Sequence, residues 1–503
     1  MHSREMSPQR AVYLPRHSVV VGVLRFSSLR QITAALALGI MLGLITLVAS
    51  PLVALGGMIG LVLLVMAITN PEVVILVVLC FTSGVIPDRF NSYVSLPVGR
   101  AQVSDLLLLW LLFVVLFRVF TDRSFRYNKT PLDPPILLFF GAVLVGLANA
   151  VLRHGIGFSD ATYDARMLMY YLIFFAITNL IQTRSQLIRL AHGIFAIGLL
   201  VAVMMILQSS LLSLIPPMVE WSPQYGGLVR IFHPGFPLVY VGLLTLVSNL
   251  ALCNNGERSL SRWLLILVMG GALFVTVTRN VLVSAAMGFV LLIAILPRFE
   301  RSRLVRNVLG IACLSIVFGS LLVLSRTESK VVDYVVAFRE RLEGMLSADI
   351  LEPGETLSYR WEEIQLARAQ ISRHPIFGIG LHNPYRPAFY PGEPQSLQRY
   401  IHNTYLSLWL KTGLVGLVSF LWFSIVFLWR GFGKWRNTQD DFLRSVLLGL
   451  AVAYVGMMLS NLVAPSMVEP GSLASFGMIL GLGESIVLQT KKSEEWRERT
   501  MLS

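Results

Sequence analysis

The stretch HNTYLSLWLKTGLVGLVSFLWFSIVFLWR, residues 402–430, passes from a polar start into an apolar run at 412–430. A helix rises about 1.5 Å per residue and therefore needs about 20 mostly apolar residues to cross a bilayer. Apolar residues make up 55% of the 503 residues and charged residues 14%, and the mean hydropathy is +0.70. The sequence therefore predicts an all-α integral membrane protein with about 12–14 transmembrane helices. Besides 412–430, the apolar runs stand at 32–49, 51–69, 72–87, 104–120, 134–152, 166–182, 190–212, 234–252, 263–278, 280–297, 307–325, 445–463 and 472–489.

Basic residues are distributed unevenly over this topology. With the N-terminus inside, 25 of the 41 Lys and Arg residues fall in short cytoplasmic segments and six in short outer segments. This asymmetry follows the positive-inside rule, so we expect both termini to be cytoplasmic. The net charge of +13 then indicates membrane orientation and contact with anionic lipids, and it argues against nucleic-acid binding.

The predicted topology divides the chain into five parts. We expect a basic cytoplasmic tail (1–31), an N-terminal bundle of about eleven spans (32–325), an extracytoplasmic helical loop (326–411), about three C-terminal spans (412–489) and a cytoplasmic tail (490–503). The cysteines lie in or beside spans, and their spacing predicts neither a disulfide nor a metal site. They are Cys80, Cys253 and Cys313.

The long outer loop is patterned as an ordered cap. VVDYVVAFRERLEGML (331–346) has the apolar spacing of an amphipathic helix, and EPGET (352–356) predicts a turn. SYRWEEIQLARAQISRHP (358–375) predicts a second helix, with Ser358 as its N-cap and an end at Pro375. FGIG (377–380) then predicts a glycine-rich loop.

Two arginines at predicted helix N-termini point to an anion. Arg279 lies in the short TRN junction before an inward-running helix, and Arg360 lies in the first turn of the loop helix. A cation there opposes the helix dipole, whereas an anion between two guanidinium groups and free amides is bound well. The alternatives are that Arg279 reaches to lipid headgroups and that Arg360 is solvated or pairs with Glu363.

His402 is the candidate base. Asn403 or Thr404 can cap the helix that follows, and Gly413 and Gly416 allow a bend or close packing after its first turns. An imidazole at this mouth suits proton transfer near neutral pH, although an interface histidine with satisfied hydrogen bonds is the alternative.

Weaker candidates surround these three residues. Arg230 and His233, in RIFHPG, can reach the same site from another loop, and Asn403 and Tyr359 adjoin the main candidates. We expect Lys411 to be an interface anchor. We expect no metal, because the loop histidines match no ligand spacing and have no grouped carboxylates.

Several function classes find no support. The sequence contains no Walker loop, G-x-S-x-G or H-E-x-x-H motif, which argues against nucleotide hydrolysis and serine or zinc proteolysis. Ion-coupled transporters keep charges near the membrane midplane, whereas here His192, Glu484 and Asp105 stand towards the ends of spans. The polar density lies in the outer segments.

The outer motifs together resemble a known superfamily. SYRWEEIQLARAQISRHPIFGIGLHN (358–383), followed by HNTYLSLWLKTGLVGL (402–417), resembles the O-antigen ligases and O-antigen polymerases, whose shared region has an Arg-containing helix, a PxxGxG loop and an HNxYL helix start. The TRN junction is similar to the Thr/Ser-Arg junction of that superfamily, except that Asn280 stands where Gly or Ala is common. The resemblance covers about 260–430.

The resemblance implies a membrane glycosyltransferase with GT-C-like architecture in the bacterial inner membrane, its site facing the periplasm or exterior. Such an enzyme moves a glycan from undecaprenyl pyrophosphate to an acceptor hydroxyl, for example on lipid A core, inverts the anomeric centre and needs no metal or other cofactor. Arg279 and Arg360 match the family arginines that hold the pyrophosphate, and His402 matches the histidine that activates the acceptor.

Three functions stay open at this point. A ligase is favoured slightly by His402 in the HN motif, and a polymerase of the same superfamily shares the motifs. A transporter or flippase of polyprenyl-linked glycan predicts a polar central cavity with basic residues inside the spans. The sugar, the acceptor, the oligomeric state, any chain-length regulator and the exact span count are not readable from the sequence.

Overall fold

The computed structural model describes residues 51–87, 90–91, 93–96, 99–210, 233–253, 259–276, 278–306, 308, 356–469 and 471–502. Two compact units divide the chain, Met1–Val65 and Met66–Ser503. Of the first unit only 51–65, in α2, is described. The predicted span at 32–49, the predicted span at 307–325 apart from residue 308, and the predicted helix at 331–346 lie outside the described residues.

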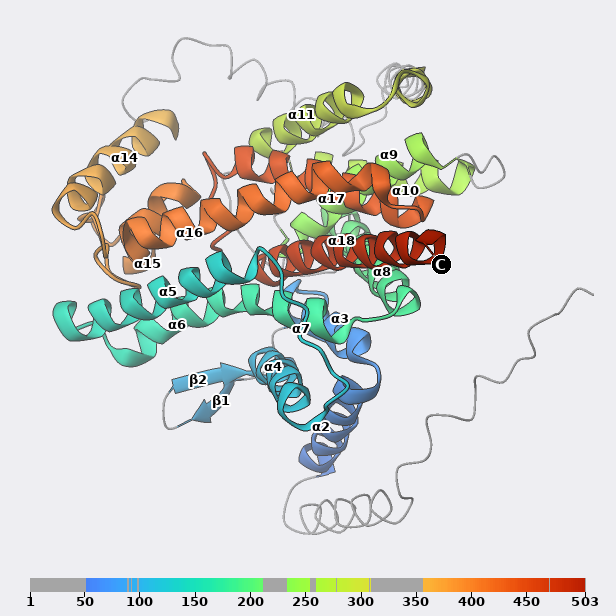
Figure 1. The fold of residues 1–503 in the computed structure, drawn as a ribbon. Coiled ribbons are helices and arrows are strands. Elements are labelled where there is room, and N and C mark those ends of the chain that lie inside the picture. Colours follow the sequence, from blue (N-terminus) through green and yellow to red (C-terminus); the bar gives the residue numbers. More distant parts are fainter. Residues whose placement is uncertain are drawn as a thin grey trace, which may run out of the picture. The chain divides into compact units, whose positions relative to one another are not determined.

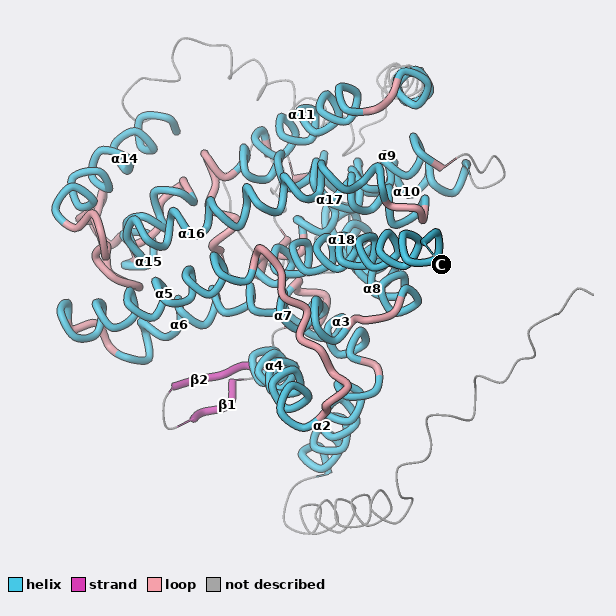
Figure 2. The backbone as a smooth tube through the Cα atoms, in the orientation of Figure 1, coloured by secondary structure: helices cyan, strands magenta, loops and turns pink. Residues whose placement is uncertain are grey.

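Helices make up most of the described chain (Figures 1 and 2). The N-terminal helices are α2 (Pro51–Thr69), α3 (Pro71–Thr82), α4 (Val103–Thr121), α5 (Asp133–His154), α6 (Phe158–Leu168), η2 (Met169–Leu172), α7 (Ile173–Leu180) and α8 (Arg184–Ser210). The later ones are α9 (Phe236–Leu252), α10 (Ser259–Val275), α11 (Arg279–Ile295), α14 (Thr356–Arg373), α15 (Gln395–Gln398), α16 (Thr404–Lys434), η5 (Trp435–Asn437), α17 (Asp441–Ser460) and α18 (Leu473–Leu502).

Six of these helices, α4, α5, α8, α16, α17 and α18, are long and apolar enough to cross a membrane. This confirms an all-α multi-pass membrane protein. The apolar helices α9, α10 and α11 are shorter, at 17 residues each. Each coincides with a predicted span.

Two predicted spans differ from the structure. The run 72–87 was expected to cross the membrane, but α3 has only 12 residues and at about 1.5 Å per residue reaches about 18 Å, short of the hydrocarbon core. The run 166–182 was expected to be one helix, but η2 separates α6 from α7. Apolar composition marks both segments as buried without revealing where the helix changes its winding.

A short hairpin is the one pair of strands among the described residues. Strand β1 (Tyr93–Leu96) pairs antiparallel with β2 (Gly99–Gln102), with Tyr93 opposite Gln102 and Leu96 opposite Gly99. Figure 2 shows the pair in magenta next to α4.

Close helix packing builds the core around α9 and α17. A Cβ on Gly449 would collide with Thr245, and one on Gly456 would collide with the Tyr240 hydroxyl. Asn249 Nδ2 donates to Ser445 Oγ at 2.8 Å between the same helices. Small residues and interhelical hydrogen bonds hold membrane helices together where the hydrophobic effect between them is absent.

The FGIG loop fixes the start of α16. Gly413 interrupts the helix with φ +72° and ψ −176°, and a Cβ there would collide with the Ile376 carbonyl. The loop enters this bend, where Ile379 N donates to Leu410 O at 2.8 Å and Leu414 N donates to Pro375 O at 3.0 Å. The expected bend at Gly413 is confirmed, and it places the first turns of α16 against the described part of the cap, 356–411.

Candidate active site

The start of α16 is anchored to the end of α17. Asn403 caps α16, because its Oδ1 accepts from Leu406 N at 2.9 Å, and its Nδ2 donates to Leu462 O at 2.8 Å. Thr404 Oγ1 donates to Oδ1 of the fully buried Asn461 at 2.5 Å. The backbone at 402–404 is thus held by the segment after α17.

His402 faces a buried carboxylate from the cap. Glu363 on α14 is 5% exposed, and its Oε2 lies 2.9 Å from His402 Nδ1 and accepts from His402 N at 3.2 Å. A carboxylate at Nδ1 favours the tautomer in which that nitrogen carries the proton. Nε2 is then the ring nitrogen available to accept a proton.

Arg360 lies one turn before Glu363 on α14. Its side chain is half-buried, and within the described residues its Nε has no hydrogen-bond partner. Burial lowers the pKa of Arg360, Glu363 raises it and the nearby Arg279 cation lowers it further. Two arginines 81 positions apart in the sequence therefore lie within electrostatic reach of one another.

Arg279 stands at the first position of α11, as expected. The preceding Thr278 makes no side-chain cap, because its hydroxyl donates to Thr276 O at 3.0 Å. Asn280 Nδ2 donates to Ser460 Oγ at 3.0 Å and fixes the start of α11 beside the end of α17. Asn280, the departure from the family pattern, thus has a structural contact here.

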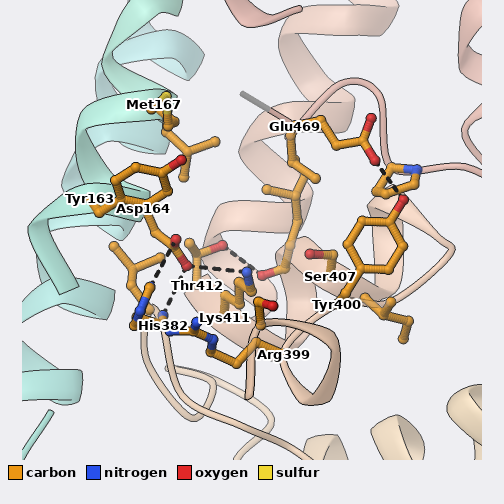
Figure 3. A pocket seen from close by; sticks show the side chains of 17 residues that line it. Tyr163, Asp164, Met167, His382, Arg399, Tyr400, Ser407, Lys411, Thr412 and Glu469 are labelled. Carbon is orange, nitrogen blue, oxygen red and sulfur yellow. Dashed lines mark hydrogen bonds and ion pairs between the residues drawn. The ribbon is translucent and has the colours of Figure 1, made fainter. Parts of the chain in front are cut away.

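Tyr400 packs next to His402. Its ring packs edge-on to the His402 ring with centroids 4.8 Å apart, and its hydroxyl donates to Glu469 Oε1 at 2.5 Å. It also interacts electrostatically with Arg360. Tyr400 in addition lines a cavity of about 220 Å³, shown in Figure 3.

Lys411, which was expected to anchor at the membrane interface, forms an ion pair that the sequence did not predict. Its Nζ lies 3.2 Å from Oδ2 of Asp164 on α6, and both residues line the same cavity (Figure 3). The bend two residues later, at Gly413, turns this part of α16 towards α5 and α6. Sequence spacing alone did not reveal it.

The weaker candidates lie apart from the cluster or have structural contacts. Tyr359 is 48% exposed and packs on Phe389, with ring centroids 6.0 Å apart. His233 is buried, its Nδ1 accepts from Gly235 N at 3.2 Å, and burial lowers its pKa to about 4. Both polar ends of Asn403 are used in capping and anchoring, and Arg230 lies outside the described residues.

Two details of α14 differ from expectation. The helix already includes Thr356, so Ser358 is inside it and is not the N-cap, and Arg360 stands in the second turn. Glu363 was considered only as a partner of Arg360, whereas it also holds His402. A Glu three residues after the arginine, on one helix face, was the available signal.

In the described part of the chain, no group of three or more His, Cys, Asp or Glu side chains is placed to hold a metal ion. The site instead presents two guanidinium groups, one imidazole and one buried carboxylate, from α11, α14 and the segment that leads into α16. These groups suit the binding of an anion next to a proton acceptor.

Residues 264–421 match the family model described as O-antigen ligase. This match confirms the resemblance noted from the motifs, and the O-antigen ligase domain contains Arg279, Arg360 and His402. The rest of the chain lies outside the match. The part of the chain that carries the candidate site is thus similar to the O-antigen ligases.

Other comparisons add little to the O-antigen ligase match. No curated protein matches the chain. One matching solved structure is described as "Structural coordination of polymerization and crosslinking by a peptidoglycan synthase complex". The alignment has 17% sequence identity and a TM-score of 0.37, and it covers 72% of this chain and 99% of the chain in that structure. At this identity and score the likeness carries no argument.

Proposed function

We propose that this protein is a membrane glycosyltransferase that moves a glycan from undecaprenyl pyrophosphate to an acceptor hydroxyl on the extracytoplasmic face of the bacterial inner membrane. The observation that carries the proposal is the His402–Glu363 pair standing beside Arg360, which in turn lies within reach of Arg279. Both termini are then cytoplasmic, and the architecture is GT-C-like.

The arginines serve the leaving group. When the bond between the anomeric carbon and the pyrophosphate oxygen breaks, negative charge grows on the pyrophosphate. Two guanidinium groups fixed by α11 and α14 stabilise that charge, and the backbone amides of the first turn of α11, which the Thr278 side chain does not cap, can add donors. The proposed reaction needs no metal, because these cations supply the positive charge at the leaving oxygen.

His402 serves the acceptor. The acceptor hydroxyl attacks the anomeric carbon from the face opposite the pyrophosphate, which inverts the configuration, and its proton passes to His402 Nε2. Glu363 keeps Nδ1 protonated, orients the ring and stabilises the positive charge that the ring gains. The cap above α16 limits water, which would otherwise hydrolyse the donor. The membrane spans provide apolar surface for the isoprenoid tail.

A ligase and a polymerase of this family differ in the acceptor, and the slight preference for a ligase rests on His402 in the HN motif. A transporter finds less support, because several ionisable groups in or next to the described spans are paired with one another. Glu484 pairs with Arg430, Glu72 with Arg189, and Asp105 with Arg166. Such pairs leave few charges to bind a moving substrate.

The proposal is tested by reconstitution in nanodiscs with a native undecaprenyl-pyrophosphate glycan, an acceptor and EDTA. We expect stoichiometric release of undecaprenyl pyrophosphate and a product of inverted configuration from the wild type, and loss of donor binding in Arg279→Ala. One added unit indicates a ligase, and a ladder indicates a polymerase. A wild type that moves lipid-linked glycan across a liposome membrane without forming product would establish the transporter instead.

A further inference from the structure

A cavity of about 220 Å³ is lined in part by Tyr400, whose ring also packs against the His402 ring. Its wall comes from α6, the loop after Gly380, the segment around α15, the first turns of α16 and the segment at 465–469 (Figure 3). A closed cavity of about 150 Å³ is enough to hold benzene. This one therefore has room for one substituted six-membered ring.

Charged groups of both signs are fixed at one side of the cavity. Asp164 Oδ2 accepts from Lys411 Nζ at 3.2 Å and from His382 N at 3.0 Å, and Asp164 Oδ1 lies 3.2 Å from His382 Nδ1. His382 has φ +61° and is the one non-glycine residue with positive φ among those described. The backbone thus adopts an unfavourable conformation in the loop that places His382 at Asp164.

The remaining lining combines aromatic and apolar surface with further polar groups. Tyr163 and Tyr400 contribute rings, and Arg399, Glu469 and Ser407 contribute donors and acceptors. Most of the lining is apolar, as in other small-molecule sites with a few placed polar groups. The lining contains two cationic side chains, Lys411 and Arg399, and two carboxylates, Asp164 and Glu469, so the cavity has no strong preference for an anion.

These features match a polyhydroxylated ring. Each sugar hydroxyl both donates and accepts, so it pairs with carboxylates, amines and other hydroxyls alike. Tyrosine rings offer flat apolar faces for the C–H side of a pyranose. We propose that this cavity binds one sugar ring of a glycan substrate and, through Tyr400, holds that substrate next to His402.

The inference rests on the proposed glycosyl transfer, and both the donor glycan and the acceptor glycan can supply the ring. The two sources are separated by kinetics. In each of the variants Asp164→Asn, Lys411→Met and Arg399→Ala we expect KM for one glycan substrate to rise about tenfold, because one hydrogen bond to a charged group is lost. We expect KM for the other glycan substrate to stay unchanged. A rise for the acceptor assigns the ring to the acceptor, and a rise for the donor assigns it to the donor.

Arg399→Ala is the variant expected to keep the fold, because Arg399 is only half-buried in the α15 segment and its loss leaves the ion pairs of Asp164 intact. Glu494→Gln is the matched control, since Glu494 also pairs with a lysine, Lys434, but away from the cavity. KM values within about twofold of the wild type for both substrates in all three cavity variants would overturn the inference.

A binding measurement separates this inference from the proposed function. Saturation-transfer NMR is recorded on the protein in nanodiscs with two soluble probes, the delipidated acceptor oligosaccharide and the oligosaccharide released from the donor by mild acid. We expect transfer to the ring protons of one probe in the wild type and its loss in Asp164→Asn and Arg399→Ala. If the wild type shows no turnover but its NMR signal is lost in the two variants, the glycosyl transfer alone is refuted. If turnover is normal but the wild type and the variants give equal NMR signals, the sugar site alone is refuted.

Discussion

At the scale of single residues, His402 has one ring nitrogen held by Glu363 and the other available. His402 itself was predicted from the sequence, because it stands before a helix with a good N-cap residue. Glu363 was not assigned this role, because its position relative to His402 depends on how α14 lies over the start of α16. No local pattern encodes that contact between residues 39 positions apart.

Glu363→Gln tests this orientation. The amide retains the shape but donates as well as accepts, so it permits the wrong histidine tautomer, and we expect kcat to fall by about 10²–10⁴-fold with little change in donor KM. The measurement is steady-state product formation in nanodiscs. Glu362→Gln is the matched control, because Glu362 is the exposed neighbour on α14. Equal kcat for the two variants would show that Glu363 has no part in catalysis.

Arg360→Lys tests the recognition of the pyrophosphate. Lysine keeps the charge but loses the planar fork, so we expect donor KM to rise about tenfold, with a larger rise in Arg360→Ala. Donor titration of product formation measures this. The exposed Arg368, on the same helix, supplies the control Arg368→Ala. An unchanged donor KM in Arg360→Ala would remove this arginine from the site.

At the scale of elements, the bend of α16 sets the position of its first turns. The glycine pattern of FGIG and Gly413 was readable as loop and bend, and Asn403 as a cap, because these depend on local conformational preference. The interruption at η2 and the short α3 were not readable, because apolar composition does not specify where tertiary packing ends a helix.

Gly413→Ala is expected to lower thermal stability. Alanine at φ +72° is strained, and its Cβ would meet the Ile376 carbonyl, so we expect a cost of about 1–3 kcal/mol and a lower Tm in detergent. Differential scanning fluorimetry gives the shift. Gly433→Ala is the control, since nothing lies within 4 Å of its added Cβ and it stands on the same helix. Equal Tm values would show that the bend is not needed.

At the scale of the whole molecule, the apolar runs and the positive-inside asymmetry sufficed to predict a multi-pass helical membrane protein. The pairing of charges between helices was beyond the sequence, because partners such as Arg430 and Glu484 stand 54 positions apart. Glu484 is 1% exposed, and Arg430 donates to it at 2.8 and 2.6 Å. This pair joins α16 to α18.

Breaking that pair on one side is expected to destabilise the bundle. Arg430→Met leaves the buried Glu484 carboxylate without its partner, at a cost of about 3–5 kcal/mol, whereas adding Glu484→Gln removes the uncompensated charge and recovers much of the loss. Tm values of the wild type, both single variants and the double variant provide the test. Additive effects of the two substitutions would mean that the residues do not interact.

The proposed transfer depends on the action of His402 on the acceptor. Its most direct test is product formation by purified protein in nanodiscs with EDTA, comparing the wild type with His402→Ala and with His374→Ala, an exposed histidine at the end of α14. The proposed role of His402 predicts full activity in the wild type and in His374→Ala, and no product in a folded His402→Ala that still binds the donor. Product formed at the wild-type rate by His402→Ala would contradict it.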